Sequence, residues 1–84
     1  MTRSINIAFF SDPGHGWARV PKAKLIKLGI ADKITSFSYQ RGINVYLEED
    51  CDAGIFLSEM KNRGQNVKII STYVNDFDEY LNNL

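Results

Sequence analysis

The sequence has a single cysteine, no long apolar run and no net charge, and each of these features argues against a class of protein. Cys51 cannot form an internal disulfide, so the core must be stable without one, and we expect a reducing, cytoplasmic compartment. The apolar run from Ile5 to Phe10 is too short for a signal peptide or a membrane span, and we expect neither. A formal charge of zero gives no overall attraction to nucleic acid or to an anionic membrane.

What is present fits one small globular domain over residues 1–84. Hydrophobic residues make up 44% of the chain, which argues against disorder. Eighty-four residues allow a two-layer core, but leave little material for a deep enclosed substrate cavity, so we expect a non-enzyme. Residues 1–41 hold seven basic and two acidic side chains, and residues 42–84 hold three basic and eight acidic ones. Folding either mixes these charges or keeps the halves apart.

Apolar periodicity and turn signals predict the order β-α-β-β-α-β followed by a short C-terminal helix. We expect a strand over 5–10, a turn-rich stretch over 11–20, a helix over 21–28, a hairpin of 34–40 with 43–47, a helix from 50–52 to 64, a strand over 67–74 and a helix from 75. This order is typical of an α+β ferredoxin-like (split βαβ) two-layer sandwich with a four-stranded antiparallel sheet. The rival is an irregular α+β meander whose first helix is a single turn.

The proposed sheet has one face without helices. If Ile5, Ile7 and Phe9 face the helices, Phe10 and Tyr46 lie on the open face. Two exposed aromatic rings there could stack nucleic-acid bases. A basic-glycine-aromatic RNA-binding motif is absent, however, so this reading has little support.

The segment from Asp12 to Arg19 contains the only histidine, His15, and the only tryptophan, Trp17. Its two glycines could direct backbone N–H groups at an anion, with charge from Arg19 or Lys22. It lacks the Gly-Lys-Ser/Thr of a Walker loop and the third glycine of a dinucleotide fingerprint. The alternative is a connecting loop in which Trp17 closes the end of the core.

An acidic run is the second candidate site and contains Glu48, Glu49, Asp50 and Asp52. It begins like a calcium loop, but Lys61 occupies the position of the bidentate glutamate. One cysteine and one histidine are too few for a zinc site. We therefore expect no metal and no cofactor. The run either starts a helix or offers an acidic patch to a basic partner.

Catalysis has weak support in the sequence. Cys51 and His15 could pair, but no third group is indicated that would orient them, and a small buried thiol is the commoner case. A hydrolase of a nucleotide signal would require His15 to lie near the acidic run. We assign no catalytic residues.

Four stretches of the sequence resemble a group of small proteins encoded in phage and prophage genomes. They read Phe-Ser-Asp-Pro-Gly-His-Gly-Trp-Ala (10–18), Leu-Gly-Ile-Ala-Asp-Lys-Ile (28–34), Ser-Tyr-Gln-Arg-Gly (38–42) and Tyr-Leu-Glu-Glu-Asp-Cys-Asp (46–52). The resemblance covers about residues 5–64 and implies a phage context without a transferable activity.

In that context we expect a protein-binding inhibitor of a host defence complex, such as an anti-CRISPR protein, acting as a monomer or homodimer in the host cytoplasm. The alternative is a nucleic-acid or nucleotide-binding protein that uses Gly14–Arg19 and the neighbouring lysines. The residues expected to contact a partner are Asp12, His15, Trp17, Arg19, Lys22, Tyr39, Arg41, Glu48, Glu49, Asp50 and Asp52.

Overall fold

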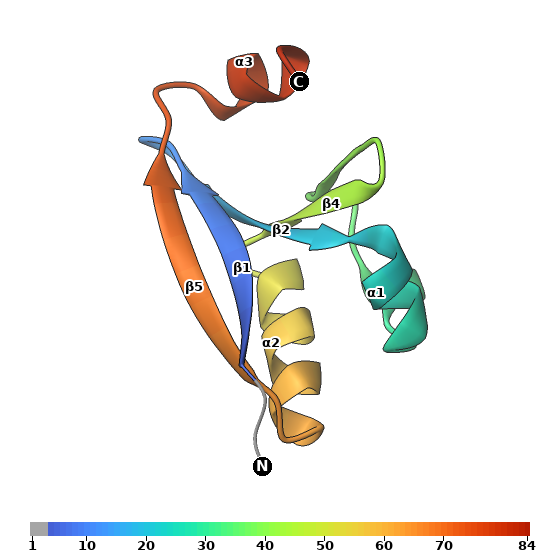
Figure 1. Cartoon of the computed structure of the whole chain (residues 1–84). Coiled ribbons are helices and arrows are strands. Elements are labelled where there is room, and N and C mark those ends of the chain that lie inside the picture. Colours follow the sequence, from blue (N-terminus) through green and yellow to red (C-terminus); the bar gives the residue numbers. More distant parts are fainter. Residues whose placement is uncertain (1–3) are drawn as a thin grey trace.

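The computed structural model describes residues 4–84, which form one five-stranded mixed sheet with three α-helices (Figure 1). The elements are β1 (Ser4–Ser11), β2 (Gly16–Pro21), α1 (Lys22–Lys27), the 3-10 turn η1 (Ala31–Lys33), β3 (Tyr39–Arg41), β4 (Asn44–Glu48), α2 (Asp52–Asn62), β5 (Asn66–Tyr73) and α3 (Phe77–Asn82). The strand order is β3-β4-β2-β1-β5, with β1 and β5 parallel and the other neighbours antiparallel. The α+β class is confirmed. The expected four-stranded antiparallel ferredoxin-like order is wrong.

The difference arises at β2, within the stretch 11–20 that we expected to be a loop. This segment pairs with β1 on one side and with β4 on the other, so it is a central strand. Pro21 stands at its last position, so the missing proline N–H falls at the end of the ladder and not within it. Trp17 and Val20 are both buried, on opposite faces, so the strand has apolar partners on each side. The chain therefore returns from β1 by a hairpin and does not cross over through α1.

The expected strand over 34–40 is also shorter, because β3 contains only Tyr39–Arg41. The residues before it form a loop that is held by Asp52, a fully buried carboxylate in the first turn of α2. Its Oδ2 accepts hydrogen bonds from the Thr35 backbone N at 3.0 Å, from Thr35 Oγ1 at 2.8 Å and from Ser38 Oγ. Phe37 lies between these anchors and projects outward, with 67% of its surface exposed.

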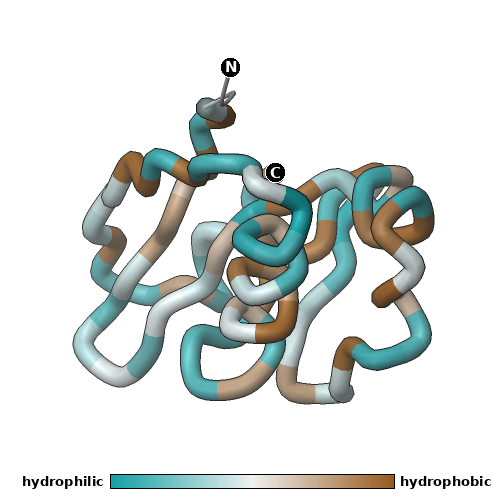
Figure 2. The backbone as a smooth tube through the Cα atoms, turned by 90° about the horizontal axis from the view of Figure 1, so that it is seen from below, coloured by the Kyte–Doolittle hydropathy of each residue, from teal (hydrophilic) through white to brown (hydrophobic). Residues whose placement is uncertain are grey.

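Helices α1 and α2 cover one face of the sheet and enclose what we call the main core (Figure 1). Hydrophobic and hydrophilic segments are interspersed along the backbone (Figure 2). Gly29 and Gly64, with φ of 74° and 72°, follow the ends of α1 and α2, in the positions predicted for helix stops. The main core consists of Ile7, Ala18, Val20, Leu25, Leu28, Ile30, Val45, Leu47, Ala53, Phe56 and Met60.

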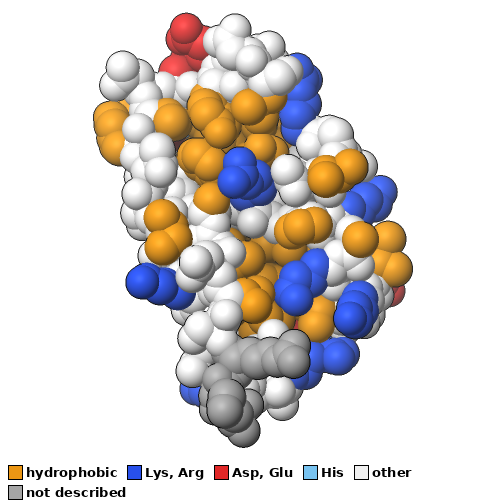
Figure 3. Space-filling view, viewed as in Figure 1, with side chains coloured by type: hydrophobic (Ala, Val, Ile, Leu, Met, Phe, Trp, Pro, Cys, Tyr) orange, Lys and Arg blue, Asp and Glu red, His pale blue; other side chains and the backbone are white. Residues whose placement is uncertain are grey.

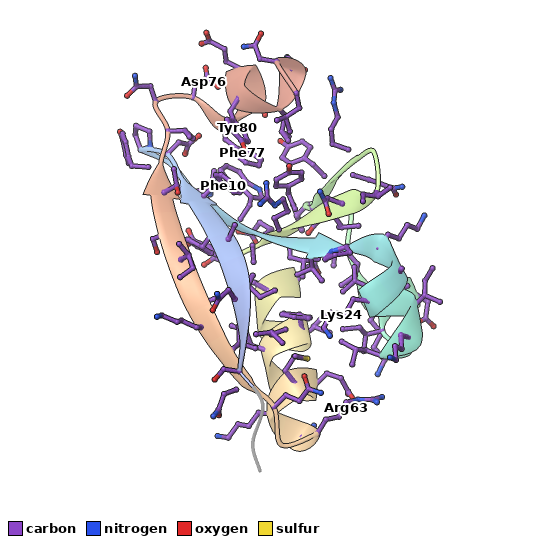
Figure 4. The ribbon with its side chains drawn as sticks, in the orientation of Figure 1. Phe10, Lys24, Arg63, Asp76, Phe77 and Tyr80 are labelled. Carbon is purple, nitrogen blue, oxygen red and sulfur yellow. The ribbon has the colours of Figure 1, made fainter. Side chains whose placement is uncertain are left out.

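The opposite face carries an aromatic cluster beneath α3. Its members are Phe10, Trp17, Tyr46, Phe77 and Leu81. Phe10, Phe77 and Tyr80 lie between α3 and the strands in Figure 4, and the ring centroids of Phe10 and Tyr80 are 4.9 Å apart. The predicted position of Phe10 and Tyr46 opposite the main core is confirmed. The expectation that this face is uncovered is wrong here, because α3 lies over both rings.

No ion pair joins the basic half of the chain to the acidic half within residues 4–84. The only ion pair among these residues joins Arg63 to Glu59 at 2.7 Å, and both belong to the acidic half. Figure 3 shows Lys and Arg side chains spread over this face of the molecule, most of them on the side of α1, and Asp and Glu side chains near α3. None of the helices in residues 4–84 is long and apolar enough to cross a membrane.

Candidate functional site

One surface cavity of about 360 Å³ brings several of the predicted partner-binding residues together. This volume lies in the range of small ligand sites in proteins. We call the cavity the aromatic–acidic pocket. It is lined by His15, Trp17, Phe37, Tyr39, Glu48, Asp50 and Cys51.

The strand register explains why three of these side chains share one face. Trp17 of β2 lies directly opposite Glu48 of β4, and Tyr46, two positions before Glu48, lies opposite Tyr39 of β3. Directly opposed residues of antiparallel strands project to the same side of a sheet. Trp17, Tyr39 and Glu48 therefore all project on the face that carries α3.

Glu48 is held in place by backbone groups at the start of α2. Its Oε2 accepts hydrogen bonds from the backbone N of Asp50 at 3.0 Å and of Cys51 at 3.1 Å. Its own backbone N donates to Ser38 Oγ at 2.9 Å. The carboxylate that accepts hydrogen bonds next to the start of α2 is that of Glu48. It is fixed before any ligand arrives, which lowers the entropic cost of binding.

Trp17 is only 5% exposed, so its burial agrees with the alternative reading of this segment, although the segment is a strand and not a connecting loop. Its ring stacks on Phe77 with centroids 3.9 Å apart, and His15 meets it edge-on at 5.8 Å. The indole Nε1 is buried and has no hydrogen-bond partner within residues 4–84. A buried donor without a partner costs about 1–3 kcal/mol, which the packing of the indole ring must offset.

Negative charge surrounds the pocket. Glu48 and Asp50 line it, and no Lys or Arg does. Burial of the hydroxyl, and then the nearby carboxylates of Asp78 and Asp12, raise the pKa of Tyr39 above its ordinary value of 10.0. The phenol thus stays neutral, and the field at the pocket favours a cation.

Asp12 has a structural position beside the pocket. Its Oδ1 accepts hydrogen bonds from the backbone N of Gly14 and of His15, each at 2.9 Å. Its Oδ2 accepts one from the Phe77 backbone N at 3.2 Å. These N–H groups, that of His15 foremost, lower the pKa of Asp12 below its ordinary value of 3.8. Asp12 therefore ties the β1–β2 turn to α3.

The remaining predicted residues lie outside the pocket. Arg19 projects over the Phe10 ring, 5.4 Å from its centroid, and Lys22 Nζ donates to the Gln40 side chain at 3.3 Å. Three more predicted residues also lie outside the pocket. Arg41 is exposed at the end of β3, and the carboxylate of Glu49 lies beside Gly16. Asp52 is buried under the loop 35–38. The predicted set is thus divided between one pocket and several separate positions.

Two lining residues were not in the predicted set. Phe37 was assigned to a strand, and its exposure follows from the loop that Asp52 holds. Cys51 was expected to be buried, but it is exposed at the start of α2. The resemblance of residues 46–52 includes this cysteine, and no pattern in the sequence alone shows that it is exposed.

The pocket also contains the groups that the sequence offered for catalysis. His15, Cys51 and the acids line the same cavity, as a hydrolase would require. Among residues 4–84, however, no hydrogen bond joins His15 to Cys51 or to a carboxylate, so the nucleophile–base contact of covalent catalysis is not made. No group of three or more potential metal ligands gathers in this part of the chain.

A comparison with protein-family models finds no match, and searches of curated proteins and of solved structures find none either.

Proposed function

We propose that this protein is a small non-enzymatic binding module that attaches to a basic surface of a larger protein through the aromatic–acidic pocket. The observation that carries the proposal is the composition of the pocket wall, which has the rings of Trp17, Phe37 and Tyr39, the imidazole of His15 and two carboxylates, but no Lys or Arg. Aromatic residues are favoured anchors at protein interfaces. The surrounding acids would steer a basic partner toward them.

The resemblance to phage proteins extends the proposal to the partner. We propose a host defence complex of the CRISPR–Cas kind, which the module would inhibit by occupying a basic surface. Such complexes carry basic surfaces for nucleic acid, and an acidic module competes for them by charge.

A second candidate, nucleic-acid binding, is favoured by two lysines of α1, which we call the basic end of the molecule. Lys24 and Lys27 lie on α1, and neither forms an ion pair within residues 4–84. The expected anion-binding loop gives it no support, since Gly16 to Arg19 belong to β2 and neither Gly14 nor Gly16 has a positive φ.

An affinity pull-down from a bacterial lysate, with and without nuclease, separates the two candidates. We would compare the wild type with the pocket variant Glu48→Gln/Asp50→Asn and with the basic-end variant Lys24→Gln/Lys27→Gln. A nuclease-resistant partner that is lost from the pocket variant and kept by the basic-end variant supports the proposal. Recovery that vanishes with nuclease and with the lysine variant contradicts it and favours nucleic acid.

A further inference from the structure

We infer that the aromatic–acidic pocket takes one arginine side chain of the partner protein, an inference that rests on the proposed function. The first ground is the pairing of rings and acids. Phe37 and Tyr39 are 67% and 41% exposed, so both offer aromatic surface to a ligand. Cations bind over such surfaces, and Glu48 and Asp50 on the same wall supply the opposite charge.

The rigidity of Glu48 favours arginine over lysine. Both of its backbone hydrogen bonds go to Oε2, so no hydrogen bond occupies Oε1 among the described residues. A planar guanidinium can stack on a ring and donate from its edge to a fixed carboxylate at the same time. The ammonium of lysine is a compact, strongly hydrated charge without a face to stack.

The arginine belongs to a polypeptide because the proposed partner is a protein. Trp17 lines the pocket, but its Nε1–H is buried and so is not a contact for the ligand. A guanidinium has only donors, so its hydrogen bonds go to the carboxylates of the wall. The methylene groups of the arginine side chain add apolar contact with the rings, which a free guanidinium ion lacks.

The experiment is a titration of the whole protein with N-acetyl-arginine amide, followed by Trp17 fluorescence and by NMR. Because a single capped residue is small, we expect a dissociation constant in the millimolar range. The neutral isostere N-acetyl-citrulline amide and N-acetyl-lysine amide should each bind about tenfold more weakly or worse, since one lacks the charge and the other the planar group. Free guanidinium at the same ionic strength should also bind more weakly. Equal binding of arginine and citrulline would overturn the inference.

Matched variants locate the site. Glu48→Gln and Phe37→Ala should each weaken the capped arginine at least about fivefold, since the first removes the charge and the second an exposed ring. The controls Asp32→Asn and Ile43→Ala change an exposed acid and an exposed apolar residue outside the pocket, and should leave binding unchanged. If controls and pocket variants behave alike, the inference is wrong.

Competition separates this inference from the proposed function. Capped arginine at saturating concentration should displace the partner captured in the pull-down, and capped citrulline should not. A partner that depends on Glu48 and Asp50 but is not displaced leaves the protein-binding module standing and overturns the arginine inference. Arginine binding without any pocket-dependent partner overturns the proposed function.

Discussion

The two faces of the sheet are built from different side chains by helices of different size. On one face α2, eleven residues long, and α1 close a core that is aliphatic apart from Phe56. On the other face α3, six residues long, covers a cluster in which four of the five buried members are aromatic. A short helix suffices there because each ring buries a large area.

This difference determines which face carries the aromatic–acidic pocket. The main core is covered by α1 and α2. The aromatic cluster extends beyond α3 toward β3, where Tyr39 lies 5.9 Å from Phe77 between ring centroids and is partly exposed. The pocket is the open margin of this cluster. The same rings therefore stabilise the fold at one end and offer contact area at the other.

The largest expected effect is on the main core. Phe56→Ala removes a fully buried ring and should destabilise the protein by about 3–5 kcal/mol, a large part of the stability of a domain of this size. We expect far-UV and near-UV circular dichroism to be lost together in denaturant titrations. Leu57→Ala, one position away and 38% exposed, is the control and should change little. Similar effects of the two variants would contradict the assignment of Phe56 to the core.

A substitution in the aromatic cluster should disrupt packing around α3 and leave most of the secondary structure intact. Phe77→Ala removes the ring that stacks on Trp17 and should cost about 3 kcal/mol. Near-UV circular dichroism and Trp17 fluorescence should change strongly, while far-UV circular dichroism keeps most of its amplitude, because α1, α2 and the main core do not contain Phe77. Leu84→Ala, at an exposed position, should leave all three signals intact. A simultaneous loss of far-UV signal would show that the two faces are one cooperative unit.

Gly16 tests the strand that both faces share. A Cβ at this position would overlap the Phe9 ring and lie 2.8 Å from Glu49 Oε2, so Gly16→Ala should destabilise by about 1–3 kcal/mol. At Gly14 the nearest atom to an added Cβ is Asp12 Oδ1, at 3.7 Å. Thermal unfolding should therefore separate Gly16→Ala from a nearly unchanged Gly14→Ala. Equal melting temperatures would exclude the overlap.

The smallest effect is the pH dependence of Asp12, which joins the β1–β2 turn to α3. Its pKa is lowered in the folded state, so its contribution to stability is present above the ordinary value of 3.8 and is lost as the pH falls through the folded value. Asp12→Asn should be less stable than the wild type at neutral pH and should converge with it in acid. A stability difference between Asp12→Asn and the wild type that stays constant from neutral pH to acid would contradict the stabilising role of the Asp12 charge. Asp32→Asn is the control.

The sequence analysis predicted the elements with strong apolar periodicity. It missed β2, in which turn-forming residues stand beside buried apolar ones. Helix α2, strands β4 and β5 and the C-terminal helix follow from apolar spacing. Strand β2 was missed because Gly16 and Pro21 at its ends read as turn residues, although Trp17 and Val20 are both buried. Its central position depends on pairing with residues distant in the sequence, which no local pattern records.

The pocket was predicted in part. Five of the lining residues were expected to contact a partner, namely His15, Trp17, Tyr39, Glu48 and Asp50. The sequence analysis assigned them to separate loops and strands and did not predict that they form one pocket. Their convergence follows from the β2–β4 register. The contribution of Phe37 follows from hydrogen bonds between a loop and the buried Asp52, which the sequence does not reveal.

The parallel pairing of β1 with β5 has a consequence for synthesis of the chain. Ser4 pairs with Asn66 and Ser11 with Tyr73, so β1 leaves the ribosome well before β5, the strand that covers its second edge. Until then β1 has only the three-residue register with β2 to hold it. Such distant contacts slow folding, and the nascent chain exposes an apolar strand edge throughout elongation.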